Sequence, residues 1–185
     1  TRVSTGWYID NIVVLTGDPV FNNPEGWETG IGDWYVDEGT WEVGVPTSGP
    51  ASARSGTRVA STVLAGDYLE KIDSRLTSPV FVVPGSDDNP RLRLWHWYNF
   101  EDDDAGWVQI KVRGGEWEDL SAAYTRSSDG AWVQTFFDLS PYAGSTVQLG
   151  FYFRSRKSDV LGGLFDETRV STGWYIDNIV VLTGD

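Results

Sequence analysis

The sequence contains no cysteine and no methionine, and it has a single histidine, His96. Without cysteine, the chain forms no disulfide, no thiolate metal site and no cysteine nucleophile. The absence of both readily oxidised sulfur side chains suits a secreted or cell-surface location. The sequence also lacks an apolar run of roughly 18 residues, so membrane insertion is not expected.

Catalytic chemistry has little support in the sequence. A serine nucleophile needs a neighbouring base, and His96 lies in the aromatic run LRLWHWYNF, where a packed core histidine is expected. The zinc-protease pattern HExxH is absent, and no spacing among the acids selects a glycosidase pair. The sequence therefore predicts a domain that is not an enzyme.

Positive charge is scarce, with 14 Lys and Arg against 27 Asp and Glu and a formal net charge of −13. Nucleic acid and anionic membrane surfaces are polyanionic and would be repelled, so neither is an expected partner. Where acids cluster locally, the negative charge of the chain favours the binding of divalent cations.

The clearest acidic cluster is EDDD at 101–104, which follows a strand-like run. Carboxylates gathered at one sheet end repel each other, and a calcium ion with its six to eight oxygen ligands would relieve that repulsion. The alternative is a charged, solvated hairpin loop. The candidate ligands of a structural calcium ion are Glu25, Asp73, Glu101, Asp102, Asp104 and Asp177.

The residues that are abundant favour β-structure. Aromatic residues make up 14% of the chain, and 21 Gly and 8 Pro supply turns. Clusters such as PGSDDNP at 84–90 and RGGE at 113–116 separate short alternating runs, whereas LSPYA at 139–143 suggests one helical turn. The pattern predicts an all-β antiparallel jelly-roll sandwich. Its predicted strands are 19–21, 34–36, 41–43, 58–64, 73–82, 91–100, 106–112, 131–138, 146–154 and 173–182.

The chain carries one exact repeat, because TRVSTGWYIDNIVVLTGD stands at both 1–18 and 168–185. The separation far exceeds the roughly 20 to 50 residue period of solenoids, so each unit is a whole domain. We expect 19–185 to be one sandwich of a tandem array and 1–18 to be the terminal strand of the preceding repeat, or a donor strand to a neighbour. A deliberate duplication is the less favoured alternative.

The repeated segment is apolar on both faces, which is typical of a strand buried inside an assembly. Simple alternation places Tyr175, Asp177, Ile179 and Val181 on one face and the intervening residues on the other. The residues predicted to contact a neighbouring repeat are Trp7, Tyr8, Ile9, Ile12, Val13, Val14, Leu15, Trp174, Ile176 and Val180.

The sequence resembles the jelly-roll domains related to MAM and cleaved-adhesin modules. Four motifs in succession carry the resemblance, at 41–81, 92–117, 137–155 and, as GWYIDNIVV, at 173–181. Such modules also accompany secreted metalloproteases of the immune-inhibitor-A type. The resemblance implies an accessory or adhesive β-sandwich without chemistry of its own, often with structural calcium. Such modules often have an Asp-Asp pair in the last strand, whereas here Asp177 is followed by Asn178.

These observations favour a structural or adhesive repeat of an extracellular filament or large surface adhesin, whose partners are identical neighbouring repeats. The first alternative is a carbohydrate-binding module, since a few of the ten Trp could form an exposed platform for a glycan while most belong to the core. The second alternative is an accessory domain of a secreted hydrolase.

Overall fold

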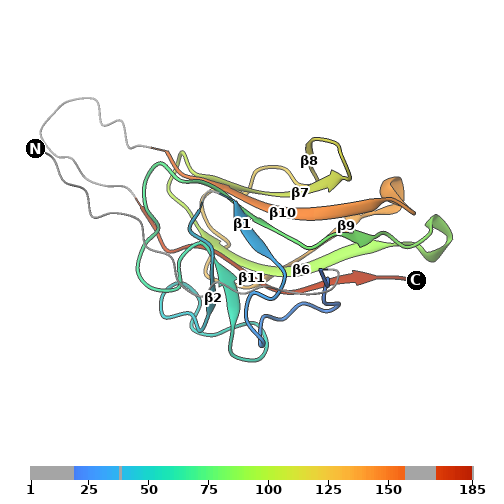
Figure 1. Cartoon of the computed structure of the whole chain (residues 1–185). Coiled ribbons are helices and arrows are strands. Elements are labelled where there is room, and N and C mark those ends of the chain that lie inside the picture. Colours follow the sequence, from blue (N-terminus) through green and yellow to red (C-terminus); the bar gives the residue numbers. More distant parts are fainter. Residues whose placement is uncertain (1–18, 38, 157–169, 185) are drawn as a thin grey trace, which may run out of the picture.

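The computed structural model describes residues 19–37, 39–156 and 170–184, which form a sandwich of two antiparallel sheets. Figure 1 shows β7 and β10 of one sheet stacked over β6 and β11 of the other. The six-stranded sheet has the order β1 (Tyr35–Asp37), β4 (Asp73–Thr77), β10 (Thr146–Arg154), β7 (Ala105–Val112) and β8 (Trp117–Asp119), with β5 (Phe81–Val82) also pairing β10. The five-stranded sheet has the order β2 (Glu42–Gly44), β3 (Val59–Ser61), β11 (Gly173–Leu182), β6 (Arg91–Asn99) and β9 (Val133–Asp138).

Alternation along the strands decides which side chains enter the core. In β10, four apolar side chains at every second position have at most 1% of their surface exposed: Val147, Leu149, Phe151 and Phe153. The intervening residues of β10 point to the outer face of the six-stranded sheet. The predicted all-β jelly-roll sandwich is therefore confirmed, and no helix of the described residues is long and apolar enough to cross a membrane.

The centre of the core is Trp174 of β11, which has no exposed surface. Its ring packs edge-on against Phe151 at 6.0 Å between centroids and lies 5.8 Å from the ring of Trp41. Its indole Nε1 donates a hydrogen bond of 3.3 Å to Nδ1 of His96, which is 1% exposed. The prediction that His96 is a packed core residue is confirmed.

Strand β11 contains a bulge that simple alternation did not predict. The register against β6 shifts between Asp177 and Val180, and Asn178 adopts a left-handed backbone with φ 52°. The extra residue returns Ile179 and Val181 to the core face that also holds Trp174. The predicted face of Tyr175, Asp177, Ile179 and Val181 is therefore wrong after Asp177.

Two other predicted strands differ from the structure, one strand was not predicted, and the rest hold, most of them with shifted ends. Residues 19–21 form no strand, because Phe21 instead stacks on Phe81 with ring centroids 4.4 Å apart. The predicted strand 73–82 is divided into β4 and β5 around Pro79, which has no N–H to donate to a ladder. Strand β8 was not predicted, although the turn at 113–116 before it was.

The predicted turns are confirmed at two places. Residues Ser86–Asp88 and Ser140–Tyr142 form short 3-10 helices, within the turn cluster 84–90 and the LSPYA motif respectively. Both connections bring the chain back toward the same end of the sandwich, since Leu139 N–H donates to the carbonyl of Pro90.

Candidate functional site

The outer face of the six-stranded sheet carries aromatic rings instead of the usual small polar residues. Trp107 of β7 and Tyr152 of β10 are paired across the sheet, and their rings stack with centroids 5.5 Å apart and an interplanar angle of 30°. The guanidinium of Arg154 lies 5.2 Å from the centroid of the Trp107 ring. All three side chains are partly exposed, so this face presents aromatic surface to solvent.

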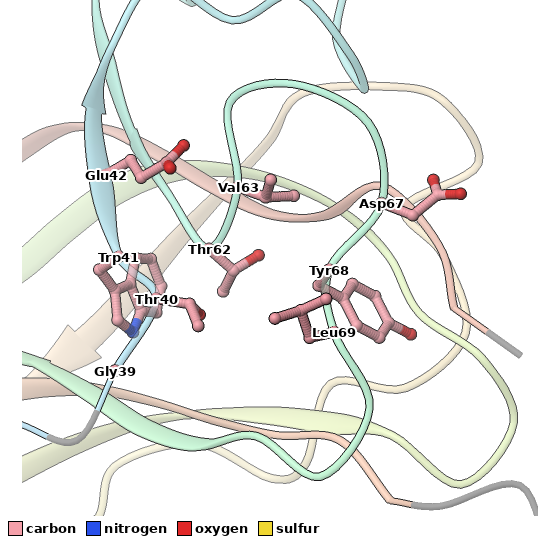
Figure 2. A pocket seen from close by; sticks show the side chains of 9 residues that line it. All are labelled: Gly39, Thr40, Trp41, Glu42, Thr62, Val63, Asp67, Tyr68 and Leu69. Atoms are coloured by element: carbon pink, nitrogen blue, oxygen red, sulfur yellow. The ribbon is translucent and has the colours of Figure 1, made fainter. Parts of the chain in front are cut away.

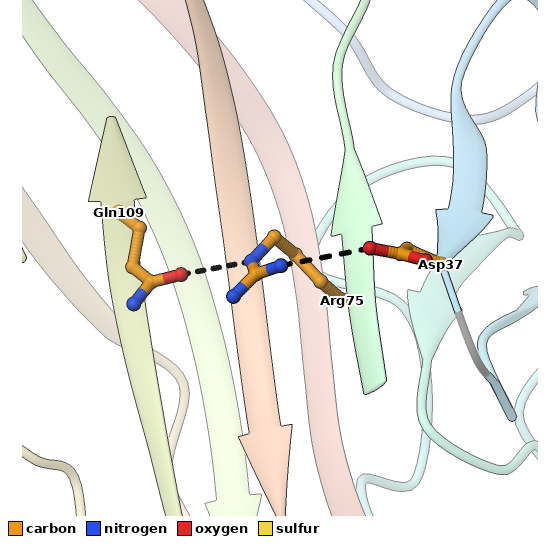
Figure 3. Close-up of polar contacts among 3 residues, drawn as sticks. All are labelled: Asp37, Arg75 and Gln109. Carbon is orange, nitrogen blue, oxygen red and sulfur yellow. Dashed lines mark hydrogen bonds and ion pairs between the residues drawn. The ribbon is translucent and has the colours of Figure 1, made fainter. Parts of the chain in front are cut away.

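Arg75 of β4 lies at the centre of this face. Its guanidinium is 4.7 Å from the ring centroid of Trp117 and 4.8 Å from that of Tyr152. Figure 3 shows the side chain held between Gln109 and Asp37: its Nε donates to Gln109 Oε1 at 2.9 Å, and its Nη1 lies 3.7 Å from Asp37 Oδ2. Such two-sided fixation limits the rotamers of a side chain that is otherwise flexible.

The polar chain continues to the edge of the sheet. Gln109, which is 8% exposed, donates from Nε2 to Asp119 Oδ1 of β8 at 2.8 Å. Asp37, Arg75, Gln109 and Asp119 thus link β1, β4, β7 and β8. The ammonium group of Lys111 lies 5.7 Å from the ring centroid of Trp117 and adds a second cation beside this ring.

Gly150 of β10 allows this arrangement to lie flat on the sheet. A Cβ at this position would stand 2.8 Å from both Arg75 Cδ and Trp117 Cζ3. A larger residue would lift the guanidinium and the indole away from the strands. The absence of a side chain at 150 therefore shapes the candidate site.

The chemistry of this face is that of binding. The rings offer apolar surface, and the carboxylates, the amide and the guanidinium offer paired donors and acceptors at fixed positions. Burial, followed by a hydrogen bond to Asp73, raises the pKa of the Tyr152 hydroxyl, so this group remains a neutral donor. His96 lies in the core, so the six-stranded sheet separates it from this outer face.

The six acids predicted to bind calcium do not form one group. Asp104 is 3% exposed, and its carboxylate accepts from the Tyr68 hydroxyl at 2.6 Å and from the backbone N–H of Arg156 at 2.7 Å. Glu101 and Asp102 belong to the loop that precedes Asp104, and Asp73 begins β4 opposite Arg154. These acids occupy the end of the sandwich where β6 leads into β7.

Glu25 and Asp177 lie elsewhere, beside the bulge of β11. Glu25 exchanges backbone hydrogen bonds with Ile179, and its carboxylate accepts from the N–H of Trp27 at 2.8 Å. Asp177 has no exposed surface, and burial is the largest cause that raises its pKa to about 6. Its two carboxylate oxygens accept the N–H groups of Ser55 and Asn178 at 3.0 and 2.7 Å.

The six candidates therefore lie at two separate places, because strand pairing puts Asp177 opposite Trp95, four residues from the end of β6 near the acidic loop. In the described part of the chain, no three His, Asp or Glu side chains are grouped as a metal site requires. These six acids therefore do not supply one common site. Calcium binding itself stays a prediction.

The predicted repeat interface falls into two parts. Trp7, Tyr8, Ile9, Ile12, Val13, Val14 and Leu15 lie outside the described residues. Trp174 and Ile176 have no exposed surface and belong to the core of the sandwich, and Val180 is 7% exposed. The structure buries these three in their own domain, which corrects the expectation that they are available to a neighbouring repeat.

The sequence did not distinguish Trp107 and Trp117 from the other tryptophans, and it did not indicate Arg75, Gln109, Asp119 or Tyr152 as site residues. A usable signal lies in β7 and β10, where aromatic and long polar residues occupy alternate positions whose neighbours are apolar. That pattern marks an outer face rich in functional groups. It does not show which strands lie side by side.

The fold defines the class of protein: the chain is a cleaved-adhesin-like β-sandwich domain, of the jelly-roll type that carbohydrate-binding modules also have. The K1 cleaved adhesin domain of Lys-gingipain from Porphyromonas gingivalis W83 superposes with a TM-score of 0.55 at 17% identity, covering 87% of this chain and 97% of that one. TmCBM61, solved in complex with β-1,4-galactotriose, superposes with a TM-score of 0.58 at 16% identity, covering 91% of this chain and all of that one. At these identities the likeness concerns the fold alone.

In sequence, the chain is homologous to part of bacillopeptidase F of Bacillus subtilis (strain 168), with 35% identity over 159 residues. The match covers 83% of this chain and spans only 10% of the relative's length. No protein-family model matches the sequence.

Proposed function

We propose that this domain is a non-catalytic accessory domain of a secreted or cell-surface protein, and that it binds a glycan on the outer face of the six-stranded sheet. The observation that carries the proposal is the fixed guanidinium of Arg75 between the rings of Trp117 and Tyr152, with Trp107 stacked on Tyr152.

A sugar ring matches both features of this face. Its C–H groups pack on aromatic rings, and its hydroxyls both donate and accept hydrogen bonds. Carboxylates such as Asp37 and Asp119 accept from hydroxyls, whereas Arg75 donates to them. Because Arg75 and Gln109 are already held in place, little side-chain entropy would be lost on binding.

The test is a polysaccharide pull-down or glycan array followed by two matched variants. Trp107→Ala removes a ring covered by Arg154 on the proposed face, and we expect the affinity for the captured glycan to fall about tenfold or more. Trp95→Ala is the control, since Trp95 is also covered by an arginine, Arg54, but lies on the five-stranded sheet. Equal losses in both variants, or no binding across a broad array, would reject this face as the site.

The homology to a segment of bacillopeptidase F supports the accessory role, because that segment is a small part of a much longer protein that is named as a peptidase. We propose that the glycan-bound domain holds a hydrolase near its substrate. Finding a catalytic domain in the full-length protein of this chain would support the role. A full-length protein built from this domain alone would contradict it.

A second candidate, an adhesive repeat of an extracellular filament, is favoured by the exact duplication of 18 residues at 1–18 and 168–185. The second copy forms β11, which lies between β3 and β6 in its sheet. Strand exchange would place the first copy in the corresponding position of a neighbouring unit. We expect deletion of Thr1–Asp18 to abolish end-to-end association, seen by electron microscopy, while the circular dichroism of the sandwich is kept. Unchanged assembly would reject strand exchange.

A further inference from the structure

A cavity of about 260 Å³ lies at the side of the sandwich, away from the aromatic face. It opens between the start of β2 and the loop that follows β3 (Figure 2). Thr40 and Trp41 form one wall and Tyr68 and Leu69 the other, with the Leu69 side chain directed toward Thr40. The lining consists of Gly39, Thr40, Trp41, Glu42, Thr62, Val63, Asp67, Tyr68 and Leu69.

The charges of this lining have one sign. It includes the carboxylates of Glu42 and Asp67 and no Lys, Arg or His. One oxygen of Glu42 accepts the backbone N–H of Leu64 at 2.8 Å, whereas Asp67 has no hydrogen bond or ion pair within the described residues. The cavity therefore presents negative charge that the surrounding described residues leave largely uncompensated.

The two carboxylates act on the same region. Figure 2 shows them on the same side of the cavity, with Val63 between them. After burial, which is the largest cause, the charges of Asp67 and Glu42 are both among the influences that raise the pKa of the nearby Tyr175 hydroxyl. A cation placed at this rim would be attracted by both, in a protein whose net charge is already −13.

The rest of the lining is mainly apolar, with the side chains of Thr40 and Thr62 as its further polar members. Leu69 keeps 67% of its surface exposed, which is costly for a leucine with nothing to cover it. The rings of Trp41 and Tyr68 are almost completely buried. Trp41 lies across the cavity from Leu69, and Tyr68 lies next to Leu69 on the same side (Figure 2). A ligand for this cavity combines a short hydrocarbon chain with a terminal positive charge.

We propose that this cavity binds an alkyl-ammonium group, namely the side chain of a lysine in a partner polypeptide. The four methylenes of lysine lie along Leu69, Val63 and the Trp41 ring, and its ammonium group lies between Glu42 and Asp67. The site is separate from the glycan face, so either assignment can fail without the other.

The probe is Nα-acetyl-lysine methylamide, titrated into the isotopically labelled full chain and followed by NMR. Trp41 Nε1–H is buried without a hydrogen-bond partner, so its indole resonance is a sensitive reporter beside the cavity. We expect the Trp41 and Leu69 resonances to shift while those of Trp107 stay unchanged. The Nε-acetylated analogue, which has the same chain but no charge, should bind at least about fivefold more weakly. Raising the salt concentration should weaken the charged probe alone.

Three variants locate the site. Asp67→Asn should weaken binding of the charged probe about fivefold, and Leu69→Ala about tenfold, and both positions are exposed and compatible with the fold. Glu116→Gln is the matched control, because it removes an exposed acid in the turn between β7 and β8.

Three outcomes would overturn the proposal. The first is equal binding of the charged and neutral probes. The second is an equal effect of Glu116→Gln and Asp67→Asn, which would mean diffuse attraction to the acidic surface. The third is a shift of the Trp41 and Leu69 resonances by galactose and not by the lysine probe, which would make the cavity a sugar subsite.

Discussion

Gly106 lies against the ring of Trp174, and the space between them is too small for a methyl group. A Cβ at position 106 would stand 2.7 Å from Trp174 Cε3 and Cζ3. Trp174 is completely buried among other aromatic rings and cannot retreat without disturbing them. The small residue in β7 and the large one in β11 therefore depend on each other, although the two strands belong to different sheets.

We expect Gly106→Ala to lower the free energy of unfolding by about 1 to 3 kcal/mol, because overpacking forces side chains out of their preferred rotamers. Urea denaturation followed by tryptophan fluorescence measures the change. Gly85→Ala is the control: its φ of −60° suits alanine, and its Cβ would have only the Asp88 carboxylate at 3.4 Å. A control as damaging as Gly106→Ala would show that contact with Trp174 is not the cause.

His96 makes the stability of the core depend on pH. Burial lowers its pKa from 6.5 to about 4, so the folded state resists protonation that the unfolded chain accepts. The contribution of neutral His96 to the free energy of unfolding is complete above pH 6.5 and is lost as the pH falls from 6.5 toward 4. Asp177 has the opposite effect, since its raised pKa favours the folded state as the pH falls below about 6.

The two contributions separate when wild type is compared with His96→Asn, whose amide oxygen replaces Nδ1 as an acceptor for the Trp174 indole. We expect the difference in unfolding free energy between the two proteins to shrink, in favour of the variant, as the pH falls from 6.5 to 4. Chemical denaturation at a series of pH values measures this. A difference independent of pH would show that His96 does not titrate differently in the folded and unfolded states.

At the scale of elements, the bulge in β11 decides which residues of the strand reach the core. Asn178 takes the left-handed conformation, and its carboxamide oxygen accepts from the Ser55 hydroxyl at 2.9 Å. Asparagine tolerates this conformation better than most residues, whereas a β-branched residue does not. The bulge thus depends on a residue type as well as on its neighbours.

Inserting one alanine after Asn178 should therefore cost far more than replacing Asn178. The insertion moves Ile179 and Val181 from the core face to the outer face, and we expect no cooperative thermal unfolding transition. Asn178→Gly keeps the conformation and should lose only about 1 kcal/mol, from the hydrogen bond to Ser55. An insertion variant that melts like the wild type would mean that β11 can shift its register freely.

At the scale of the whole molecule, the excess of acids is the dominant property, and calcium is the cation predicted to offset it. A ligand bound only by the folded state stabilises it and so raises Tm. At a concentration of 100 times Kd, the free energy of unfolding rises by about 2.7 kcal/mol. The prediction requires a higher Tm in calcium than in chelator. Asp177→Asn, beside the bulge, and Asp104→Asn, in the acidic loop, would show which of the two separated places is responsible. Identical melting curves in calcium and chelator would end the prediction.

Much of the architecture followed from local pattern. The alternating apolar residues of β6, β7, β10 and β11 and the turn residues between strands predicted an antiparallel sandwich, because backbone geometry enforces a period of two. The buried role of His96 followed from its aromatic neighbours. The start of β11 at Gly173 and its end at Leu182 coincide with the predicted run.

The candidate site was only partly accessible to such reasoning. Arg75, Gln109 and Tyr152 come from three strands that are distant in sequence, and nothing in their local surroundings pairs them. The distribution of the six calcium candidates was hidden for the same reason, since strand register keeps Asp177 apart from the acidic loop. One unpredicted bulge also exchanged the faces of Ile179 and Val181.

By itself, the sequence determined the class of fold, the acidic surface, the absence of sulfur chemistry and the presence of a duplicated segment, because each depends on composition or on contacts between near neighbours in the chain. Tertiary structure alone decided that Arg75 lies against the rings of Trp117 and Tyr152, and that Glu42 and Asp67 line one cavity. These sites arise from strand order and register, which are set by the packing of the whole core.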